Sequence, residues 1–195
     1  MKTTRLEAYS DAVIAIVITI MVLELRPPEG EGFAGLGALL PTFLAYVLSF
    51  AFLSIYWNNH HHLLQATEQV NGAVLWANIH LLFWLSLVPF TTAWMSEHPG
   101  QSAPTALYGL NLLMAAVAYT ILTYAIIALQ GRGSALARAL GRDSKGKLSL
   151  LLYLLGIAAA FFRPAVAYAF YVVVALMWLI PDRRIEAALP TPKEP

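Results

Sequence analysis

The chain has 195 residues, of which 59% are hydrophobic and only 12% are charged, and its formal net charge is +1. A water-soluble domain of this size needs roughly twice that charged fraction to cover its surface, so the apolar excess is predicted to face lipid. The near-neutral charge gives no indication of nucleic-acid binding, and the absence of cysteine excludes disulfides, zinc–thiolate sites and thiol catalysis.

Six apolar segments are long enough to be candidates for crossing a membrane, which takes about 20 helical residues. They predict an all-α, polytopic membrane protein: one six-helix domain over residues 1–189 and a disordered tail over 190–195. Pro89 is expected to kink the third helix, and Pro164 to begin the sixth. The predicted helices cover residues 5–25, 36–58, 73–95, 104–130, 148–162 and 164–180.

The distribution of basic residues predicts the orientation in the membrane. With six crossings, both termini and the second and fourth loops share one side, and only Arg26 and Arg163 fall on the other. Because basic loops stay inside, both termini are predicted to lie in the cytoplasm, with the chain in the plasma membrane. The basic residues on the inner side are Lys2, Arg5, Arg132, Arg138, Arg142, Lys145, Lys147, Arg183, Arg184 and Lys193.

The outer loops carry acidic residues. Two interpretations stay open: an outer vestibule that concentrates cations, or ordinary solvated loop charge. The residues are Glu24, Glu29, Glu31 and Glu97.

The first segment is expected to be a permanent helix, since Asp11 interrupts its apolar run and no small-residue cleavage site is evident. Thr4 and Glu7 have the spacing of a capping box, which predicts the helix start. The uninterrupted apolar run covers only 12 residues, from Ala12 to Leu23. Because a charge at membrane depth is costly in lipid, this helix is predicted to be central and wrapped by the others.

One face of the first helix is apolar. Ile16, Ile20 and Leu23 recur at i, i+4 and i+7, and Thr19 lies close to this stripe. Asp11 is rotated by about 140° from Ile16 at ~100° per residue, so the carboxylate faces elsewhere. On periodicity alone the stripe is interpreted as packing.

Three motifs follow one another in the first half of the chain. They read Arg5-Leu-Glu-Ala-Tyr9-Ser10-Asp11, Ile55-Tyr-Trp57-Asn58-Asn-His-His61, and Leu75-Trp-Ala-Asn78-Ile-His80-Leu-Leu-Phe83 with its continuation Ser86-Leu-Val-Pro89-Phe90-Thr. The first resembles the Arg-x-x-x-Phe-Ser-Asp signature of the lysosomal and endosomal potassium channel family, transmembrane protein 175. The other two are also similar to that family, whereas the second half agrees mainly in hydropathy. Tyr9 stands where the family has phenylalanine.

The resemblance implies a function for the apolar stripe. In this family the first helices of four subunits line a pore that has no carbonyl selectivity filter. By position, Ile16, Ile20 and Leu23 would form the constriction, with Thr19 beside it. The expected protein is therefore a homotetrameric, K⁺-permeable channel in a lipid bilayer, with modest K⁺ over Na⁺ selectivity and a hydrophobic neck that also serves as the gate.

The resemblance also implies a scaffold role for the polar residues of the signature. Arg5, Ser10 and Asp11 would hydrogen-bond to the second and third helices and fix the rotation of the pore helix. The expected partners are Trp57, Asn58, His61, Asn78 and His80.

Other interpretations of the polar residues were weighed. Consecutive histidines at 60–62 do not converge on a helix, so no metal site and no cofactor is expected, although pH sensing stays possible. No enzyme constellation emerges, an intramembrane enzyme using Asp11 and His61 being the nearest. The rivals to a channel are a proton-conducting or proton-coupled transporter that uses Asp11 and a histidine, and a membrane protein without permeation.

Overall fold

The structure is a computed structural model that describes residues 3–28, 33–67, 69–131, 133–141 and 143–180. Its elements are helices, so an all-α fold is confirmed for this part of the chain. The charges at Lys2, Glu29, Glu31, Arg132 and Arg142, and everything expected of residues 181–195, including the tail, lie outside the described residues. The helices are α1 (Thr4–Leu23), α2 (Ala34–Ala38), α3 (Leu40–Gln65), α4 (Gly72–Ser86), α5 (Val88–Glu97), α6 (Ser102–Gln130), α7 (Ala135–Leu140), α8 (Ser144–Ala160) and α9 (Pro164–Leu179).

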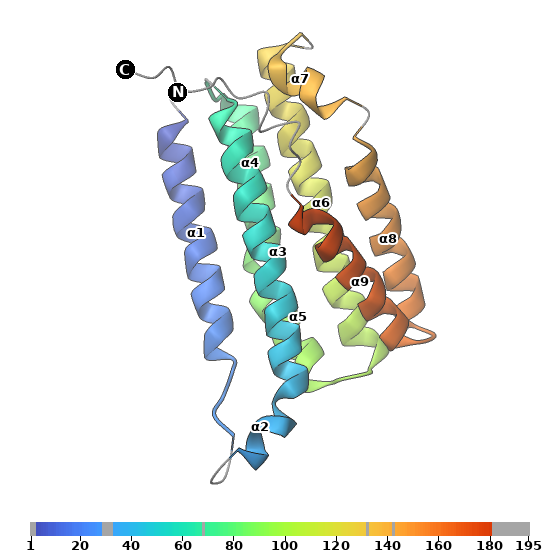
Figure 1. The fold of residues 1–195 in the computed structure, drawn as a ribbon. Coiled ribbons are helices and arrows are strands. Elements are labelled where there is room, and N and C mark those ends of the chain that lie inside the picture. Colours follow the sequence, from blue (N-terminus) through green and yellow to red (C-terminus); the bar gives the residue numbers. More distant parts are fainter. Residues whose placement is uncertain (1–2, 29–32, 68, 132, 142, 181–195) are drawn as a thin grey trace.

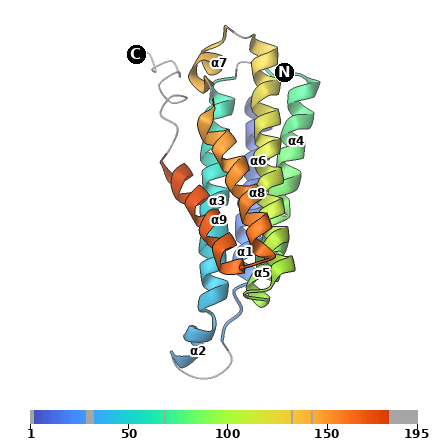
Figure 2. The same ribbon diagram turned by 90° about the vertical axis from the view of Figure 1, so that its right-hand side faces the viewer.

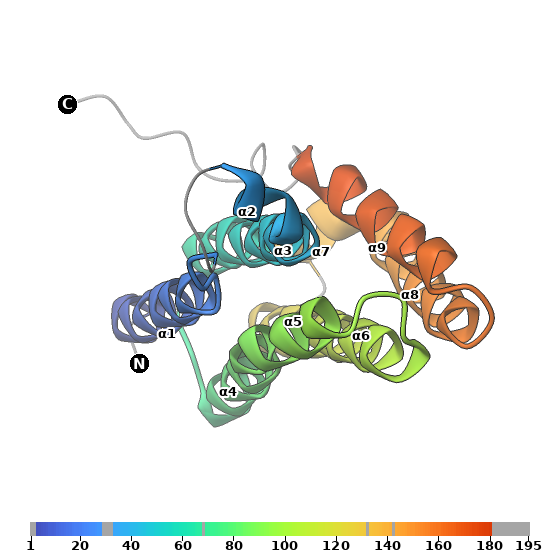
Figure 3. The ribbon, with the colours of Figure 1, turned by 90° about the horizontal axis from the view of Figure 1, so that it is seen from below.

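The long helices run side by side as one bundle, with α1 at one end and the α8–α9 pair at the other (Figure 1, Figure 3). α1 packs on α3, α4 and α5, while α6 packs on α4, α5 and α8. The start of α1, the α3–α4 connection and α7 lie at the same end of the bundle, opposite α2 and the α8–α9 turn (Figure 2).

Local chemistry explains most helix boundaries. Asn71 caps α4, because its Oδ1 accepts from the Val74 N–H at 3.0 Å. Pro89 takes one of the first two positions of α5, so the predicted kink is a break at Leu87 between α4 and α5. Gly131, at a φ of 91°, ends α6, and Pro164 begins α9 as predicted.

Two buried clusters hold the bundle together. The first joins α1, α3, α4 and α6 through residues such as Ile14, Leu53, Leu81 and Leu122. The second joins α3, α6, α8 and α9 and is rich in buried rings, among them Phe52, Tyr108, Tyr153 and Tyr171.

In the part of the chain that the structure describes, four helical stretches are long and apolar enough to cross a membrane, as predicted for a multi-pass membrane protein. They are Thr4–Leu23, Leu40–Gln65, Gly72–Glu97 and Ser102–Gln130. The last two predicted segments contain α8, with 17 residues, and α9, with 16. At ~1.5 Å per residue such helices are about 25 Å long, short of a hydrocarbon core of about 30 Å, so six crossings stay a prediction.

The first helix begins at Thr4 as expected, but the predicted Thr4–Glu7 capping box is wrong. The cap position is Thr3, with helical backbone angles and no side-chain cap, and Thr4 is already helical. The Glu7 carboxylate lies 3.0 Å from Nδ1 of His61 on α3, so it is engaged between helices and does not reach back to the cap.

The sequence predicts a first helix that is wrapped by the others. Within one chain α1 is not wrapped in this way. It lies at the edge of the bundle with one face packed and one face open (Figure 3). The carboxylates of Glu7 and Asp11 contact α3, so these two charges have partners although other helices do not surround α1 within one chain.

Candidate pore helix and its polar anchors

The packed face of α1 follows the helical repeat. Ser10, Ile14, Val17 and Met21, at i, i+4, i+7 and i+11, are buried against the neighbouring helices. Because this face is fixed, the opposite face of α1 has a defined direction as well.

The predicted constriction residues lie on that open face. Ile16 is 57% exposed, Ile20 43% and Leu23 76%. Thr19 is also exposed, and its hydroxyl hydrogen points back to the helix, towards the carbonyls of Ile16 at 2.8 Å and Ala15 at 3.1 Å. One chain therefore presents an apolar stripe with a single hydroxyl oxygen beside it.

A shallow apolar groove runs along one side of this stripe. Ile16 and Ile20 form its α1 wall, while Pro89 and Phe90 belong to the opposite wall on α5. Phe90 is itself strongly exposed. Large apolar side chains that converge on an open groove suit contact with lipid or with another protein surface.

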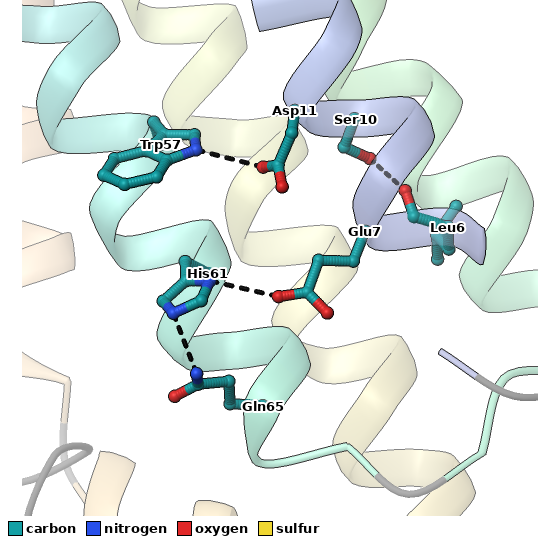
Figure 4. Close-up of polar contacts among 7 residues, drawn as sticks. All are labelled: Leu6, Glu7, Ser10, Asp11, Trp57, His61 and Gln65. Carbon is teal, nitrogen blue, oxygen red and sulfur yellow. Dashed lines mark hydrogen bonds and ion pairs between the residues drawn. The ribbon is translucent and has the colours of Figure 1, made fainter. Parts of the chain in front are cut away.

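One row of polar contacts joins α1 to α3 (Figure 4). The Trp57 indole N–H donates to Oδ1 of Asp11 at 3.0 Å. One turn further toward the start of α1, Nδ1 of His61 lies 3.0 Å from Oε1 of Glu7, and its Nε2 lies 2.8 Å from the amide nitrogen of Gln65. The rings of Trp57 and His61 stack with their centroids 5.9 Å apart, which aligns the two contacts.

A second, fully buried row joins α1, α3 and α4. The Ser10 hydroxyl donates to the carbonyl of Leu6 at 2.8 Å and accepts from the Asn78 amide at 2.9 Å. Oδ1 of Asn78 therefore faces Nε2 of His60, 2.7 Å away, and that nitrogen must carry the proton. Nδ1 of His60 has no partner among the described residues, but the contacts from Ser10 through Asn78 to His60 join three helices in one arrangement.

Some residues of the signature and its expected partners are not joined in this way. Arg5 and Tyr9 are exposed, and neither they nor Asn58 make a side-chain hydrogen bond to another described residue. His80 accepts from the Trp84 indole at 3.0 Å within its own helix.

Sequence reasoning left out two residues of the site. His60 was considered only as part of the histidine run, and Glu7 only as a capping residue. A signal existed for Glu7: it stands four residues before Asp11, as His61 stands four residues after Trp57, so the two pairs recur with the helical repeat. For His60 there was no such signal, because the sequence does not distinguish it from His61.

The three consecutive histidines diverge in the structure. His60 contacts Asn78 on α4, whereas His61 contacts Glu7 on α1. Among the described residues no group of three histidine, aspartate or glutamate side chains is placed to hold a metal ion.

Comparisons with known proteins place this arrangement in a family. A family model described as "Endosomal/lysosomal potassium channel TMEM175" matches residues 5–89. A protein of Chryseobacterium sp. (strain P1-3) named as a potassium channel is 54% identical over 189 residues, which cover 97% of this chain and 98% of that relative. The zebrafish protein named "Endosomal/lysosomal proton channel TMEM175" is 30% identical over 65% of this chain, which corresponds to 24% of its own length.

A solved structure shares the fold. The crystal structure of a lysosomal potassium-selective channel TMEM175 homolog from Chamaesiphon minutus matches with a TM-score of 0.79 at 28% identity, covering 92% of this chain and 97% of that one.

The fold, the anchoring of α1 to α3 and α4, and the similarity to these proteins thus define a multi-pass, all-helical membrane protein of the ion-channel class. More narrowly, the chain belongs to the TMEM175 family of potassium channels. The family and these relatives are ion channels and not enzymes.

Proposed function

We propose that this chain forms a K⁺-permeable channel in which α1 of four identical subunits lines the pore. Ile16, Ile20 and Leu23 form the hydrophobic neck, and Thr19 lies beside it. The observation that carries the proposal is the division of α1 into two faces. The face opposite the apolar stripe is anchored to α3 and α4 by hydrogen bonds, and the stripe itself is left uncovered within one chain.

The neck acts through hydration. An ion that passes a narrow ring of isoleucine and leucine side chains sheds part of its water shell, and nothing on those side chains replaces the lost water. K⁺ holds its water less tightly than Na⁺, so it crosses at lower cost, and the preference is modest. The same ring closes the pore when it dewets.

The membrane arrangement belongs to the same proposal. Six crossings place α7 and both termini in the cytoplasm, and the protein works in the plasma membrane. Because the chain has no native cysteine, a cysteine introduced at Ser134, just before α7, would report the side by its reaction with a membrane-impermeant reagent. Labelling of intact cells would contradict the arrangement.

Ion flux through the purified protein in liposomes tests the neck. We expect wild-type protein to pass K⁺ faster than Na⁺. Ile16→Asn places an amide in the ring that hydrates the neck, so the K⁺ preference should be lost while flux of both ions rises. Ile121→Asn is the matched control, because Ile121 on α6 is a comparably placed isoleucine with 44% exposure.

Two outcomes would contradict the neck. One is an Ile16→Asn channel that keeps the wild-type ion preference. The other is an equal loss of preference in Ile121→Asn. Wild-type protein that passes neither ion would favour a membrane protein without permeation.

A second candidate function is proton conduction, because the zebrafish relative is named a proton channel. Asp11 and the Glu7–His61 pair would be the carriers. Asp11→Asn separates the two candidates, since asparagine still accepts from Trp57 but no longer titrates. For a K⁺ channel we expect reduced assembly and unchanged K⁺ flux per assembled channel. A selective loss of proton flux, measured with a pH-sensitive dye in the same liposomes, would instead favour proton conduction.

A further inference from the structure

A second cavity lies in the bundle between α3, α6, α8 and α9, and none of its lining residues belongs to α1. It encloses about 60 Å³ and is partly open to the outside. A single buried water needs only ~10–15 Å³, so the cavity is large enough for a group of several heavy atoms.

The walls of this cavity are aromatic. Two pairs of rings are in contact: Phe52 with Tyr153, centroids 6.3 Å apart, and Tyr56 with Tyr119, at 6.2 Å. Ring faces carry partial negative charge and attract organic cations. The aromatic lining residues are Phe52, Tyr56, Tyr119, Tyr124, Tyr153 and Trp178.

Asp143 supplies the only formal charge among the described lining residues. It caps α8, where its Oδ1 accepts from the Gly146 N–H at 3.1 Å, and its carboxylate is half-buried. Lys145 is directed elsewhere: its ammonium lies 4.6 Å above the Trp178 ring and donates to the carbonyl of Ile180 at 2.8 Å. Among the lining residues that the structure describes, the formal charge is therefore negative.

Two hydroxyl groups in the wall are unused. Tyr56 is only 9% exposed and Tyr153 only 2%, yet neither hydroxyl bonds to a described residue. By contrast, the Tyr119 hydroxyl donates to the carbonyl of Asn59, and the Trp178 indole donates to Ser149. Neither oxygen is among the fully enclosed side-chain atoms that lack a partner, so both reach open space, where a polar atom of a ligand or a water can bond to them.

The carboxylate and the unused hydroxyls lie at different depths. Asp143 and Tyr153 are ten residues apart in sequence and line the same side of α8. The separation along the axis is ~15 Å, and because helical side chains lean toward the N-terminus, the polar atoms are closer, roughly 10 Å apart. The cavity is thus elongated, with a negative end, an aromatic middle and a hydroxyl-lined end.

We propose that this cavity binds a small protonated amine with a flat apolar body and a hydrogen-bonding group at its far end. The ammonium group pairs with Asp143, the body lies among the aromatic rings, and the far-end group bonds to Tyr56 and Tyr153. The site is separate from the candidate pore, and the inference does not depend on what the pore conducts.

Calorimetric titration of the full chain in nanodiscs tests the site, with empty nanodiscs as the blank. Tyramine is the probe, because it carries an ammonium group and a phenol at opposite ends of one ring. Phenethylamine lacks the phenol hydroxyl, and 3-(4-hydroxyphenyl)propionate replaces the ammonium by a carboxylate. We expect saturable binding of tyramine, weaker binding of phenethylamine and no binding of the carboxylate.

Conservative variants test which residues bind the ammonium group and which bind the phenol hydroxyl of tyramine. Asp143→Asn keeps a good helix cap and tolerates the left-handed backbone at φ 38°, so the fold is retained while tyramine affinity falls about tenfold or more. Tyr56→Phe and Tyr153→Phe should abolish the preference for tyramine over phenethylamine. Glu97→Gln and Tyr168→Phe, which remove a carboxylate and a hydroxyl outside this cavity, should leave affinity unchanged.

Three results would overturn the proposal. The first is the absence of saturable heat above empty nanodiscs, which would mean that only water fills the cavity. The second is equal binding of the carboxylate compound to wild-type protein, a comparison that needs no variant to fold. The third is wild-type affinity in Asp143→Asn.

Discussion

The α1 side of the bundle and its α8–α9 side differ in how closely their helices approach one another. At one end, α1 is joined to α3 and α4 by side-chain hydrogen bonds that involve Ser10, Asp11 and Asn78. At the other end, hydrogen bonds such as that from the Trp178 indole to Ser149 also join the helices, but α6, α8 and α9 come close together as well. The Tyr171 ring packs directly against Gly109 and Gly156 and leaves no space for a Cβ atom at either glycine.

Helix packing in a membrane fixes two quantities, the rotation of each helix about its axis and the distance between helices. Hydrogen bonds between helices are directional, so they determine which face of α1 is left open. Small residues let two helix backbones approach closely, so they determine the distance between the helices. They have less influence on which side chains the outer face of each helix exposes. A helix that must direct one stripe of side chains benefits from the first kind of contact.

The largest effect is expected from Asn78→Ala. The substitution leaves the buried His60 N–H without an acceptor, which costs ~1–3 kcal/mol, and it also removes a hydrogen bond to Ser10, so the loss should be about 3 kcal/mol. Thermal denaturation in detergent, followed by size-exclusion chromatography, measures it. Asn58→Ala is the matched control, because Asn58 bonds to no other described side chain. An equal loss in both variants would contradict the role of the buried row.

A somewhat smaller effect is expected from Gly156→Ala. The added methyl group would overlap the Tyr171 ring, and overpacking of this kind costs about 2 kcal/mol. Gly37→Ala in α2 is the control, since a Cβ there meets no atom within 4 Å. The same denaturation assay compares them. If Gly156→Ala were as stable as the control, close approach would not be what holds α8 and α9.

The smallest effect is expected from Glu7→Gln. Its contact with His61 is partly exposed, and such pairs contribute about 0.5 kcal/mol or less. A double-mutant cycle with His61→Gln isolates the contact, and K⁺ flux should stay at the wild-type level. A coupling as large as the effect of Asn78→Ala would mean that both rows, and not only the buried one, position α1.

The sequence predicted the elements of the first half in detail. Pro89 acts where expected, and so does Pro164 in the second half, because both follow from local rules. Helical spacing predicts the i, i+4, i+7 stripe on α1 but indicates packing for it. That the stripe is open in one chain agrees instead with what the family resemblance implies. The partners across helices were harder to predict. His60 and not His61 bonds to Asn78, since only the rotation of α3 decides which of two adjacent histidines points inward.

Less of the second half of the chain could be predicted from the sequence. Its motif content is low, and hydropathy gives the positions of helices but not what fills the space between them. The aromatic cavity depends on residues from α3, α6, α8 and α9 that are up to 126 positions apart, from Phe52 to Trp178. Nothing in local spacing brings Asp143 to the same cavity as Tyr56.

The hydroxyl of Thr19 has a consequence for the sign of the permeant ion. Its hydrogen is directed to the carbonyls of its own helix, so only the oxygen lone pairs are left to face outward. In the proposed pore, surrounded by four copies of α1, four such oxygens would form a collar that accepts hydrogen bonds and donates none. A collar of this polarity favours a partly dehydrated cation and disfavours an anion, which supplies charge discrimination where the neighbouring isoleucines have none.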